Sequence, residues 1–549
     1  MPKRSECYSQ AWIPHGTSYG VLVGELELLG RGFVWRAAIV LVARALTMRF
    51  TPIRSSRAVH PGRAVLAHTA PLPILSLMDE DIMVGTQRLG AAVTIATFLR
   101  RHRFDLVCVL VLFVFCGSLR AIYQSESVTD TPIRADAGSY VFAAANLRFH
   151  GAYSTDRPGP EAPVSRTDIA PGYPLFLTPF VEQTDTGWTI RINHVRRVQI
   201  LMDCLVAVLT FALARLALPL GWALLAGGLT CMSPHLIVFS DYLLTESLFT
   251  FLMMAGVWVL ALAWRRPGAW LLFAGIFLLG LAAEVRLVAL AVPLFFAPLF
   301  LFRGEAGGWT DRRVRVLAVT ALVAGVLAVQ MLHATFERVA VTNSGALREV
   351  PVEHSQVKSP LEYLDVTIRP PKWYVEGKSH VFPLNRDPEW RDRTTSGFAA
   401  EPHAYLRWNL YGRLIAIWNF DNVFAGDVYI YPMVRKGFEE NVVLGAIHSL
   451  MRFLHWPLFG LALAGVVLLV AQSRRRGGPR MEMWGLWPSA LGFVYFLAVL
   501  TVLAWLPRYS IPARPFSYIM AAACLAALVK WLRKDRKLTP QHGPSEARG

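Results

Sequence analysis

The sequence has little charge and little cysteine for its length. Only 17% of its 549 residues are charged and 54% are hydrophobic, whereas average soluble domains carry about 25% charged residues. All the cysteines but Cys7 lie inside apolar runs, and none forms a Cys-x-x-Cys pair. These deficits exclude a disulfide-stapled secreted domain and a cysteine zinc site. The cysteines are Cys7, Cys108, Cys116, Cys204, Cys231 and Cys524.

Long apolar runs are present instead. A run of about 20 apolar residues crosses a bilayer as a helix, and several stretches approach that length. The sequence therefore predicts an all-α polytopic membrane protein with about ten transmembrane helices, within a range of nine to twelve. The expected spans are 104–123, 198–217, 219–239, 243–264, 269–284, 286–303, 314–335, 452–472, 483–506 and 513–532.

The net charge of +17 sits largely in short clusters between these runs, such as 100–103, 265–266 and 474–476. In a soluble protein this excess would suggest nucleic acid, but membrane topology explains it better because cytoplasmic loops collect Lys and Arg. We expect no nucleic-acid partner, a multi-pass plasma-membrane protein and two cytoplasmic termini. The polar segments 124–197 and 336–443 then form long external loops.

The ends of the chain differ from this membrane region. Residues 1–95 scatter Arg, Pro and Gly without a clear period and contain no clean signal-peptide pattern. We expect them to be a disordered extension from an upstream start, with Met78 or Met83 as the native first residue. The remaining divisions are a membrane module at 96–335 (including the loop 124–197), an external loop region at 336–443, C-terminal transmembrane helices at 444–535 and a cytoplasmic tail at 536–549.

Asp136 follows the first span, in a polar stretch that reads as an amphipathic helix. Asp136, Tyr140, Ala144 and Leu147 fall on one stripe of that helix, facing the membrane. Two interpretations remain open at this point. Asp136 caps a helix that begins at Ala137, a common role for Asp, or it is the reactive acid of a site at the membrane surface.

Two further stretches bring polar groups to the same side. Glu246 lies about one turn inside the helix of the span 243–264, where an ionisable group is either functional or a partner of the helix dipole. The stretch 170–177 contains Tyr173 between two prolines. It forms either a re-entrant helix or an ordinary turn.

Positive charge also reaches this face, from Arg286 in the stretch 280–287 and Arg508 in the stretch 507–515. Each arginine alone is typical of a membrane-interface anchor, whereas together they form a clamp suited to a phosphate. A third group stands at the external entrance of the second span. Its members either meet lipid phosphates or snorkel; they are Arg191, Arg196 and Arg197.

Aromatic residues mark the segment 402–419, which reads as an amphipathic stretch of the second external loop. Tyr405, Trp408, Tyr411 and Trp418 either cover the site and hold an acceptor or form a membrane-interface belt. We expect most of them to belong to the belt.

In their order and spacing, these motifs resemble the GT-C glycosyltransferases that use polyprenyl-phosphate sugars, of the protein O-mannosyltransferase and aminoarabinose transferase type. Glu284 and Leu287 depart from the pattern, where a small residue and a proline are usual. The stretches that carry the resemblance are Asp136–Ser154, Pro171–Leu175, Ser233–Phe249, Gly280–Arg286 and Arg508–Pro515.

The resemblance implies a GT-C-like helical bundle and a role for Asp136 as base or as the group that orients the acceptor. Many members carry a neighbouring second acid, but here Ala135 and Ala137 flank Asp136. Glu246 is the preferred second catalytic acid, with Asp168 or Glu161 as alternatives. No metal ligand is assigned, although some members use a divalent metal. The lone histidines near this face, His194 and His235, are weak candidates for ligands.

The resulting hypothesis is a hexosyl or pentosyl transferase that acts on the external face with inversion. Arg286 and Arg508 bind the phosphate of a polyprenyl-phosphate sugar donor, and Tyr140, Tyr173 and Tyr509 contact substrate. The acceptor is a glycan, a lipid or a protein. The alternatives are a scaffold and a polytopic flippase or transporter of lipid-linked sugars, which should show mid-span charges or symmetric broken helices.

Overall fold

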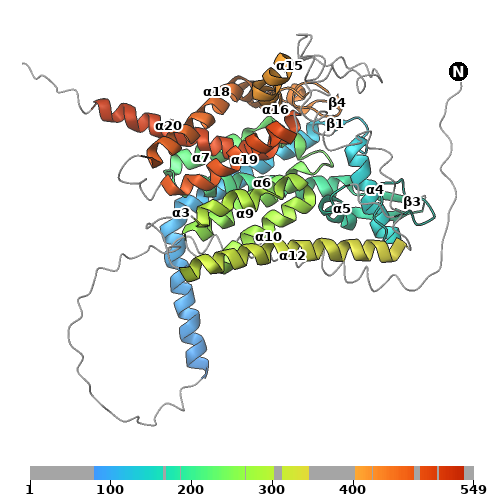
Figure 1. Ribbon diagram of the computed structural model, residues 1–549, viewed down its shortest axis with the longest axis horizontal. Helices are drawn as coiled ribbons and strands as arrows, with labels where there is room; N and C mark the ends of the chain where they lie inside the picture. The colour runs from blue at the N-terminus through green and yellow to red at the C-terminus, as the bar shows by residue number, and fades with distance from the viewer. Residues whose placement is uncertain are drawn as a thin grey trace, which may run out of the picture.

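The protein is described by a computed structural model, shown in Figure 1 as a bundle of helices with short strands at one end. The segments that the structure describes are 80–164, 169–185, 187–265, 268–301, 312–344, 402–422, 425–474, 483–503 and 506–536.

Within the described segments, six helices are long and apolar enough to cross a membrane. They lie in α3 (Glu80–Glu126), α6 (Ile192–Ala214), α9 (Glu246–Arg265), α12 (Arg312–Ser344), α18 (Val442–Ser473), and α20 (Arg514–Arg536) with the preceding η7 (Pro507–Ala513). Shorter apolar helices occupy the other expected spans; they are α7 (Leu220–Met232), α10 (Ala269–Val285), α11 (Val292–Leu301) and α19 (Trp487–Leu503). The membrane class is therefore supported, while the count of ten spans stays a prediction.

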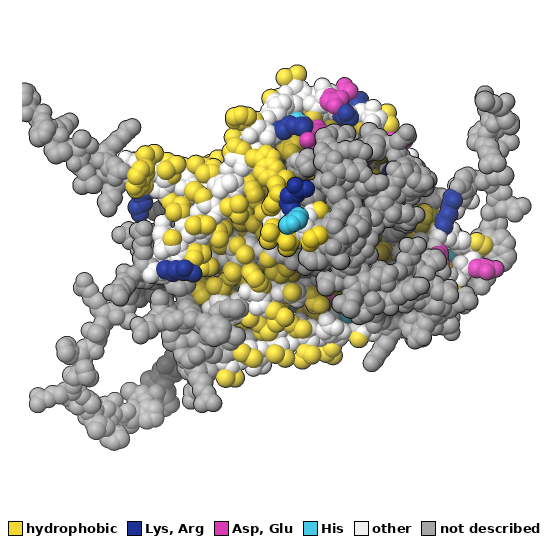
Figure 2. Space-filling view, turned by 45° about the horizontal axis from the view of Figure 1, so that its top comes forward, with side chains coloured by type: hydrophobic (Ala, Val, Ile, Leu, Met, Phe, Trp, Pro, Cys, Tyr) yellow, Lys and Arg dark blue, Asp and Glu magenta, His cyan; other side chains and the backbone are white. Residues whose placement is uncertain are grey.

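Helix α9 lies at the centre of the bundle, since 94% of its most apolar stretch is buried. In α12, only 17% of the corresponding stretch is buried. Small residues allow α9 and α10 to approach closely. A Cβ added at Gly256 would lie 2.8 Å from Leu279, and one at Gly275 would lie 2.7 Å from Leu260. Figure 1 shows α12 running along the lower edge of the bundle, and Figure 2 shows hydrophobic side chains over most of the described surface of one face.

The segment 219–239, expected to be one span, is divided into two helices. Helix α7 ends at Met232, Ser233 adopts an extended backbone, and the short α8 (Pro234–Phe239) follows. Pro234 has no N–H to continue the α7 ladder, which accounts for the break. Residues 240–245 then form a non-helical turn, so that α9 begins at Glu246 and not at 243.

The two long loops of the sequence are joined in space. Strand β1 (Val128–Thr129) pairs antiparallel with β4 (Met433–Arg435), and a hairpin of β2 (Val181–Thr184) and β3 (Gly187–Ile190) closes the first loop. The first loop also holds α4 (Ala135–His150), α5 (Gly172–Leu177) and η2 (Thr178–Phe180). The other short elements are η3 (Leu287–Ala289), α17 (Gly437–Glu440) and η6 (Met483–Leu486).

The segment 402–419 folds as α15 (Pro402–Arg407), the π-helical η5 (Trp408–Gly412) and α16 (Arg413–Ile417). Tyr405, Trp408 and Trp418 are almost completely buried, and only Tyr411, at 48% exposure, points outward. The expectation that most of these aromatics form an interface belt is wrong, because three of the four rings pack inside the protein.

Helix α3 is already helical at Glu80, so it overlaps the last part of the extension expected at 1–95. The rest of that extension, with Met78 as a candidate start, lies outside the described residues. So do most of the loop region 336–443 and the end of the tail 536–549.

One buried arginine contacts three helices, through an ion pair and through hydrogen bonds to backbone carbonyl oxygens. Arg120 of α3 is 1% exposed, and its Nε lies 3.1 Å from Oδ2 of Asp203 on α6. Its Nη1 also donates to the carbonyl oxygens of Cys116 and of Cys231, which belongs to α7. These contacts compensate the arginine charge within two apolar spans, a pattern that we did not predict from the sequence.

We expect Asp203→Asn to lower the free energy of unfolding by roughly 3–5 kcal/mol, because it leaves Arg120 as an uncompensated buried charge. The double variant Arg120→Met/Asp203→Leu should recover most of that loss. Thermal or chemical unfolding of purified protein in detergent measures both. Equal stability of Asp203→Asn and the wild type would show that the pair does not hold the helices.

Candidate active site

Asp136 lies in the first turn of α4. The helix begins at Ala135 with Arg134 as its N-cap, and no side chain makes a capping hydrogen bond. The capping interpretation is therefore wrong, since Asp136 is inside the helix that it was expected to precede. Ala135 has a φ of 46°, a conformation that costs a non-glycine residue free energy and often accompanies functional sites.

Asp136 is paired with Arg508. Nη2 of Arg508 donates to Oδ2 of Asp136 at 2.5 Å, and the carboxylate side chain remains 44% exposed, whereas the arginine is 12% exposed. These residues stand far apart in the chain, in α4 and in η7 before the last helix. The pair therefore joins the first loop to the C-terminal end of the bundle.

Glu246 stands behind this pair, between two arginines. Its Oε1 lies 3.1 Å from Nη2 of Arg286 and 3.9 Å from Nε of Arg508, and its side chain is only 1% exposed. Neither Glu246 Oε1 nor Arg508 Nε has a hydrogen-bond partner of good geometry. The result is a compact cluster of two carboxylates and two guanidinium groups, which we call the charged cluster: Asp136, Glu246, Arg286 and Arg508.

The charged cluster forms because helix ends meet at one end of the bundle. Glu246 opens α9, where the helix dipole favours an acid. Arg286 is the extended C-cap residue of α10, which packs antiparallel beside α9. Close contact between α5 and α10 supports this region, since a Cβ on Gly172 would lie 2.8 Å from the backbone of Glu284.

The tyrosines predicted to bind substrate have different surroundings. Tyr509 lies beside both arginines, with its ring centroid 4.9 Å from Cζ of Arg286 and 5.2 Å from Cζ of Arg508. Tyr140 is half-buried, and burial raises its pKa to about 12, with a further contribution from the charge of Glu246. Tyr173 is completely buried, with its hydroxyl donating to Gln199 at 2.7 Å. It therefore supports the site from behind and has no surface for a substrate.

Tyr431 is a neighbour of Asp136 that sequence reasoning missed. Its hydroxyl donates to the carbonyl oxygen of Arg134 at 3.3 Å, and its ring centroid lies 5.1 Å from that of Tyr242. Burial raises its pKa, and the charge of Asp136 raises it further. The position of Tyr431 depends on the pairing of β1 with β4, for which short strands leave no clear signal in the sequence.

Two of the three arginines at the start of α6 form ion pairs within the protein. Nε of Arg196 lies 3.0 Å from Oδ1 of Asp241, Arg191 pairs with Glu182, and Arg197 is exposed. Burial raises the pKa of Asp241 to about 6 against the opposing effect of Arg196. Of the three arginines for which lipid-phosphate contact and snorkelling were both open, two are thus paired with acids of the same chain.

Among the residues that the structure describes, the alternative partner acids and ligands form no ion pair with the charged cluster. Glu161 is exposed, Asp168 lies outside the described residues, and Nε2 of His235 bonds to the carbonyl oxygen of Phe420. Within the described ranges, no group of three or more His, Cys, Asp or Glu side chains could hold a metal ion. Both carboxylates of the cluster are instead engaged by arginine.

No protein-family model matches the chain, and no curated protein matches it. The solved oligosaccharyltransferase AglB from Archaeoglobus fulgidus, in complex with an inhibitory peptide and a dolichol-phosphate, is similar at a TM-score of 0.45 and 12% identity. The match covers 80% of this chain and 52% of that one, so this chain spans about half the length of the archaeal protein.

ArnT from Cupriavidus metallidurans, solved with undecaprenyl phosphate, is similar at a TM-score of 0.32 and 14% identity, over 80% of this chain and 82% of that one. At these scores, neither likeness assigns a function to this chain.

We expect Glu246→Gln to lower the melting temperature, because Arg286 and Arg508 then share a largely buried site with only Asp136 as counter-charge. The exposed Glu161→Gln is the control and should change nothing, as is usual for surface substitutions. Thermal unfolding in detergent compares the two. If both variants melt with the wild type, Glu246 does not hold the arginines in place.

Proposed function

We propose that the chain is an integral membrane glycosyltransferase. It transfers a hexosyl or pentosyl group from a polyprenyl-phosphate donor to an acceptor hydroxyl, with inversion, at the external face of the plasma membrane. The charged cluster is the reaction site. The motifs that resemble polyprenyl-phosphate-dependent GT-C enzymes support this choice, since all of them except Pro171–Leu175 contribute residues to the cluster.

The observation that carries the proposal is the pairing of an exposed carboxylate with a pair of arginines. Asp136 is 44% exposed and touches Arg508, while Arg286 stands behind a shared carboxylate. Nε of Arg508 is buried 3.9 Å from Oε1 of Glu246, so an incoming anion would bind the terminal nitrogens of this guanidinium group. Arginine presents a planar fork of donors that matches phosphate oxygens.

The proposed reaction follows from this geometry. The acceptor oxygen attacks the anomeric carbon and transfers its proton to Asp136, while the bond from the anomeric carbon to the phosphate oxygen breaks. The electron pair of that bond leaves with the lipid phosphate. Arg508 and Arg286 stabilise the charge that develops on its oxygens, and a single displacement inverts the anomeric configuration.

Glu246 has a different role from the catalytic one expected. Its carboxylate is 1% exposed and is engaged by Arg286, so an acceptor hydroxyl has no access to it. We assign it as a positioning residue that holds both guanidinium groups. When a donor phosphate competes for Arg508, Asp136 is released from its ion pair and becomes available as the base.

The substrate-facing surfaces are aromatic. The Tyr509 ring lies against both arginines, and Tyr140 and Tyr431 stand near the carboxylates. Aromatic rings of this kind stack against sugar faces and also suit a membrane interface. The apolar bundle surface and membrane lipids accommodate the polyprenyl tail, and the acceptor is a glycan, a lipid or a protein.

We expect Asp136→Asn to reduce sugar transfer by roughly 10²–10⁴-fold, the usual contribution of a general base, without loss of membrane insertion. The control is Asp130→Asn, an exposed acid of the same loop. The assay measures glycan transfer in membranes supplied with polyprenyl-phosphate sugars. An Asp136→Asn enzyme with wild-type activity would refute the assignment of the base.

We expect Arg508→Ala to raise the KM for the lipid donor by at least ~10-fold, because one charge-assisted phosphate contact contributes about 1.5–3 kcal/mol. The control is Arg197→Ala, which removes an exposed arginine near the same face. Steady-state kinetics with varied donor provide the measurement. Unchanged donor kinetics would remove Arg508 from the phosphate site.

The transport alternative is tested in the same membranes. Reconstituted liposomes with a labelled polyprenyl-phosphate sugar in one leaflet report its movement to the other leaflet. Translocation without transfer to any acceptor would favour a transporter of lipid-linked sugars. Transfer that Asp136→Asn abolishes, with no translocation, is the outcome expected here.

A further inference from the structure

The helix that carries Asp136 begins without a cap of its own. Arg134 is the N-cap residue of α4 and has an extended backbone, but its side chain makes no capping hydrogen bond. The first N–H groups of a helix have no partners within the helix, and a Ser, Thr, Asp or Asn at the N-cap usually accepts from one of them. Arginine carries only donors and cannot do so. The start of α4 therefore needs an acceptor from elsewhere in the chain.

The hydroxyl of Tyr431 stands where this acceptor is needed. It donates to the carbonyl oxygen of Arg134 at 3.3 Å, and the same oxygen accepts the first hydrogen bond of the helix, from the N–H of Gly138. The N–H of Ala137, the third residue of α4, acts on this hydroxyl as a hydrogen-bond donor and opposes the rise that burial causes in the pKa of Tyr431. In an ordinary capped helix, the side chain of the N-cap residue accepts from this third N–H.

The turn that Tyr431 contacts is unfavourable by itself. Ala135 has a φ of 46°, in the left-handed region that disfavours every residue with a Cβ atom. Asp136 follows directly, and its carboxylate reaches Arg508 from this turn. Without a contact that holds the turn, the backbone is expected to relax and to move the carboxylate away from Arg508.

Tyr431 is itself held firmly by its surroundings. Its ring is 5% exposed and meets the ring of Tyr242 edge to face, with the centroids 5.1 Å apart. The carbonyl oxygen of the next residue, Pro432, accepts from the N–H of Asp130 at 3.1 Å, beside the pairing of β4 with β1. The second long loop therefore presents this hydroxyl to α4 from a fixed position.

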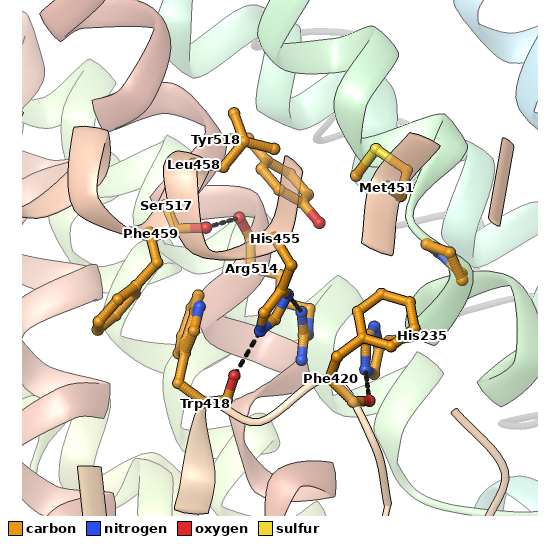
Figure 3. Close-up of a pocket in the computed structure, with 11 residues that line it drawn as sticks. His235, Trp418, Phe420, Met451, His455, Leu458, Phe459, Arg514, Ser517 and Tyr518 are labelled. Atoms are coloured by element: carbon orange, nitrogen blue, oxygen red, sulfur yellow. Dashed lines mark hydrogen bonds between the residues drawn. The ribbon is translucent and has the colours of Figure 1, made fainter. Parts of the chain in front are cut away.

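The same loop is also anchored before it reaches Tyr431. Figure 3 shows two histidine rings beside it, one from α18 and one from α8. Nε2 of His455 bonds to the carbonyl oxygen of Trp418. Nε2 of His235 bonds to that of Phe420 at 2.8 Å. Contacts on both sides of Tyr431 thus tie this part of the loop to the helical bundle and to the first loop.

We infer that Tyr431 is a positioning residue for Asp136, and that its hydroxyl caps the helix on which the proposed base stands. The inference rests on the proposed function for the role of Asp136, whereas the cap itself concerns only the fold. It makes the site depend on both long loops, since the first supplies the carboxylate and the second holds the start of its helix. The hydroxyl is engaged by the backbone of α4, so it acts through Asp136 and not on a substrate.

Hydrogen exchange of the full-length protein in detergent tests the cap without an assay of activity. We expect Tyr431→Phe to speed exchange of the first amides of α4 roughly five- to tenfold, the usual effect of a lost N-cap, and to leave α9 unchanged. Arg134→Ser in the Tyr431→Phe background should restore slow exchange, because serine at the N-cap accepts from the helix, whereas Arg134→Ala should not. The control is Tyr429→Phe, which removes a buried hydroxyl of the same loop that has no hydrogen-bond partner of good geometry.

Steady-state kinetics of the same variants test the effect on the proposed base. We expect Tyr431→Phe to lower kcat roughly five- to tenfold with an unchanged KM for the lipid donor, since only an interaction made in the transition state is weakened. Arg134→Ser should recover kcat in this background, and Arg134→Ala should not. A raised donor KM at unchanged kcat would overturn the inference, and so would a loss of kcat that Arg134→Ser fails to recover, because Tyr431 would then contact a substrate.

The two measurements separate failure of this inference from failure of the proposed function. Wild-type exchange and wild-type kcat in Tyr431→Phe, with an inactive Asp136→Asn, would overturn the cap and leave the proposed function intact. Faster exchange in Tyr431→Phe with unchanged kcat would overturn the positioning role alone. A fully active Asp136→Asn would remove the base and with it the positioning role, whatever the exchange at α4.

Discussion

The shared carboxylate of Glu246 is the interaction on which the site depends. It is buried at the start of α9 and holds Arg286 from α10 at 3.1 Å, with Arg508 of η7 at 3.9 Å. Arg508 in turn pairs with Asp136. The buried Glu246 therefore indirectly orients Asp136, which belongs to the first loop. The central helix of the bundle thereby determines where the two loops and the C-terminal helix place their polar groups.

Most of the fold and the members of the charged cluster could be predicted from the sequence. Apolar runs indicate helices. Because successive spans end on alternate sides of the membrane, the sequence also predicts that four charged residues share one side: Asp136, Glu246, Arg286 and Arg508. The partners of these residues could not be predicted, because ion pairing depends on distances of a few ångströms. The sequence indicated two free arginines for phosphate, whereas the structure shows both engaged by acids.

The remaining differences have local causes. A single proline at 234 divides an apolar run whose hydropathy is otherwise continuous. Tyr173 and Tyr405 have aromatic side chains that suit an interface or a core equally well, and only packing decides between these places. Tyr431 comes beside Asp136 through a strand of three residues, which is too short to recognise by its periodicity. Short tertiary contacts of this kind determine the walls of the site.

The arginine pair also bears on how a reaction at this site would end. A sugar phosphodiester carries one negative charge, whereas a released phosphate monoester carries close to two at neutral pH, since its second pKa is about 6. If the site acts as proposed, Arg286 and Arg508 would therefore attract the lipid phosphate product more strongly than the lipid-phosphate sugar donor. Such an enzyme would retain its product, and its turnover would depend on how fast fresh donor displaces that lipid.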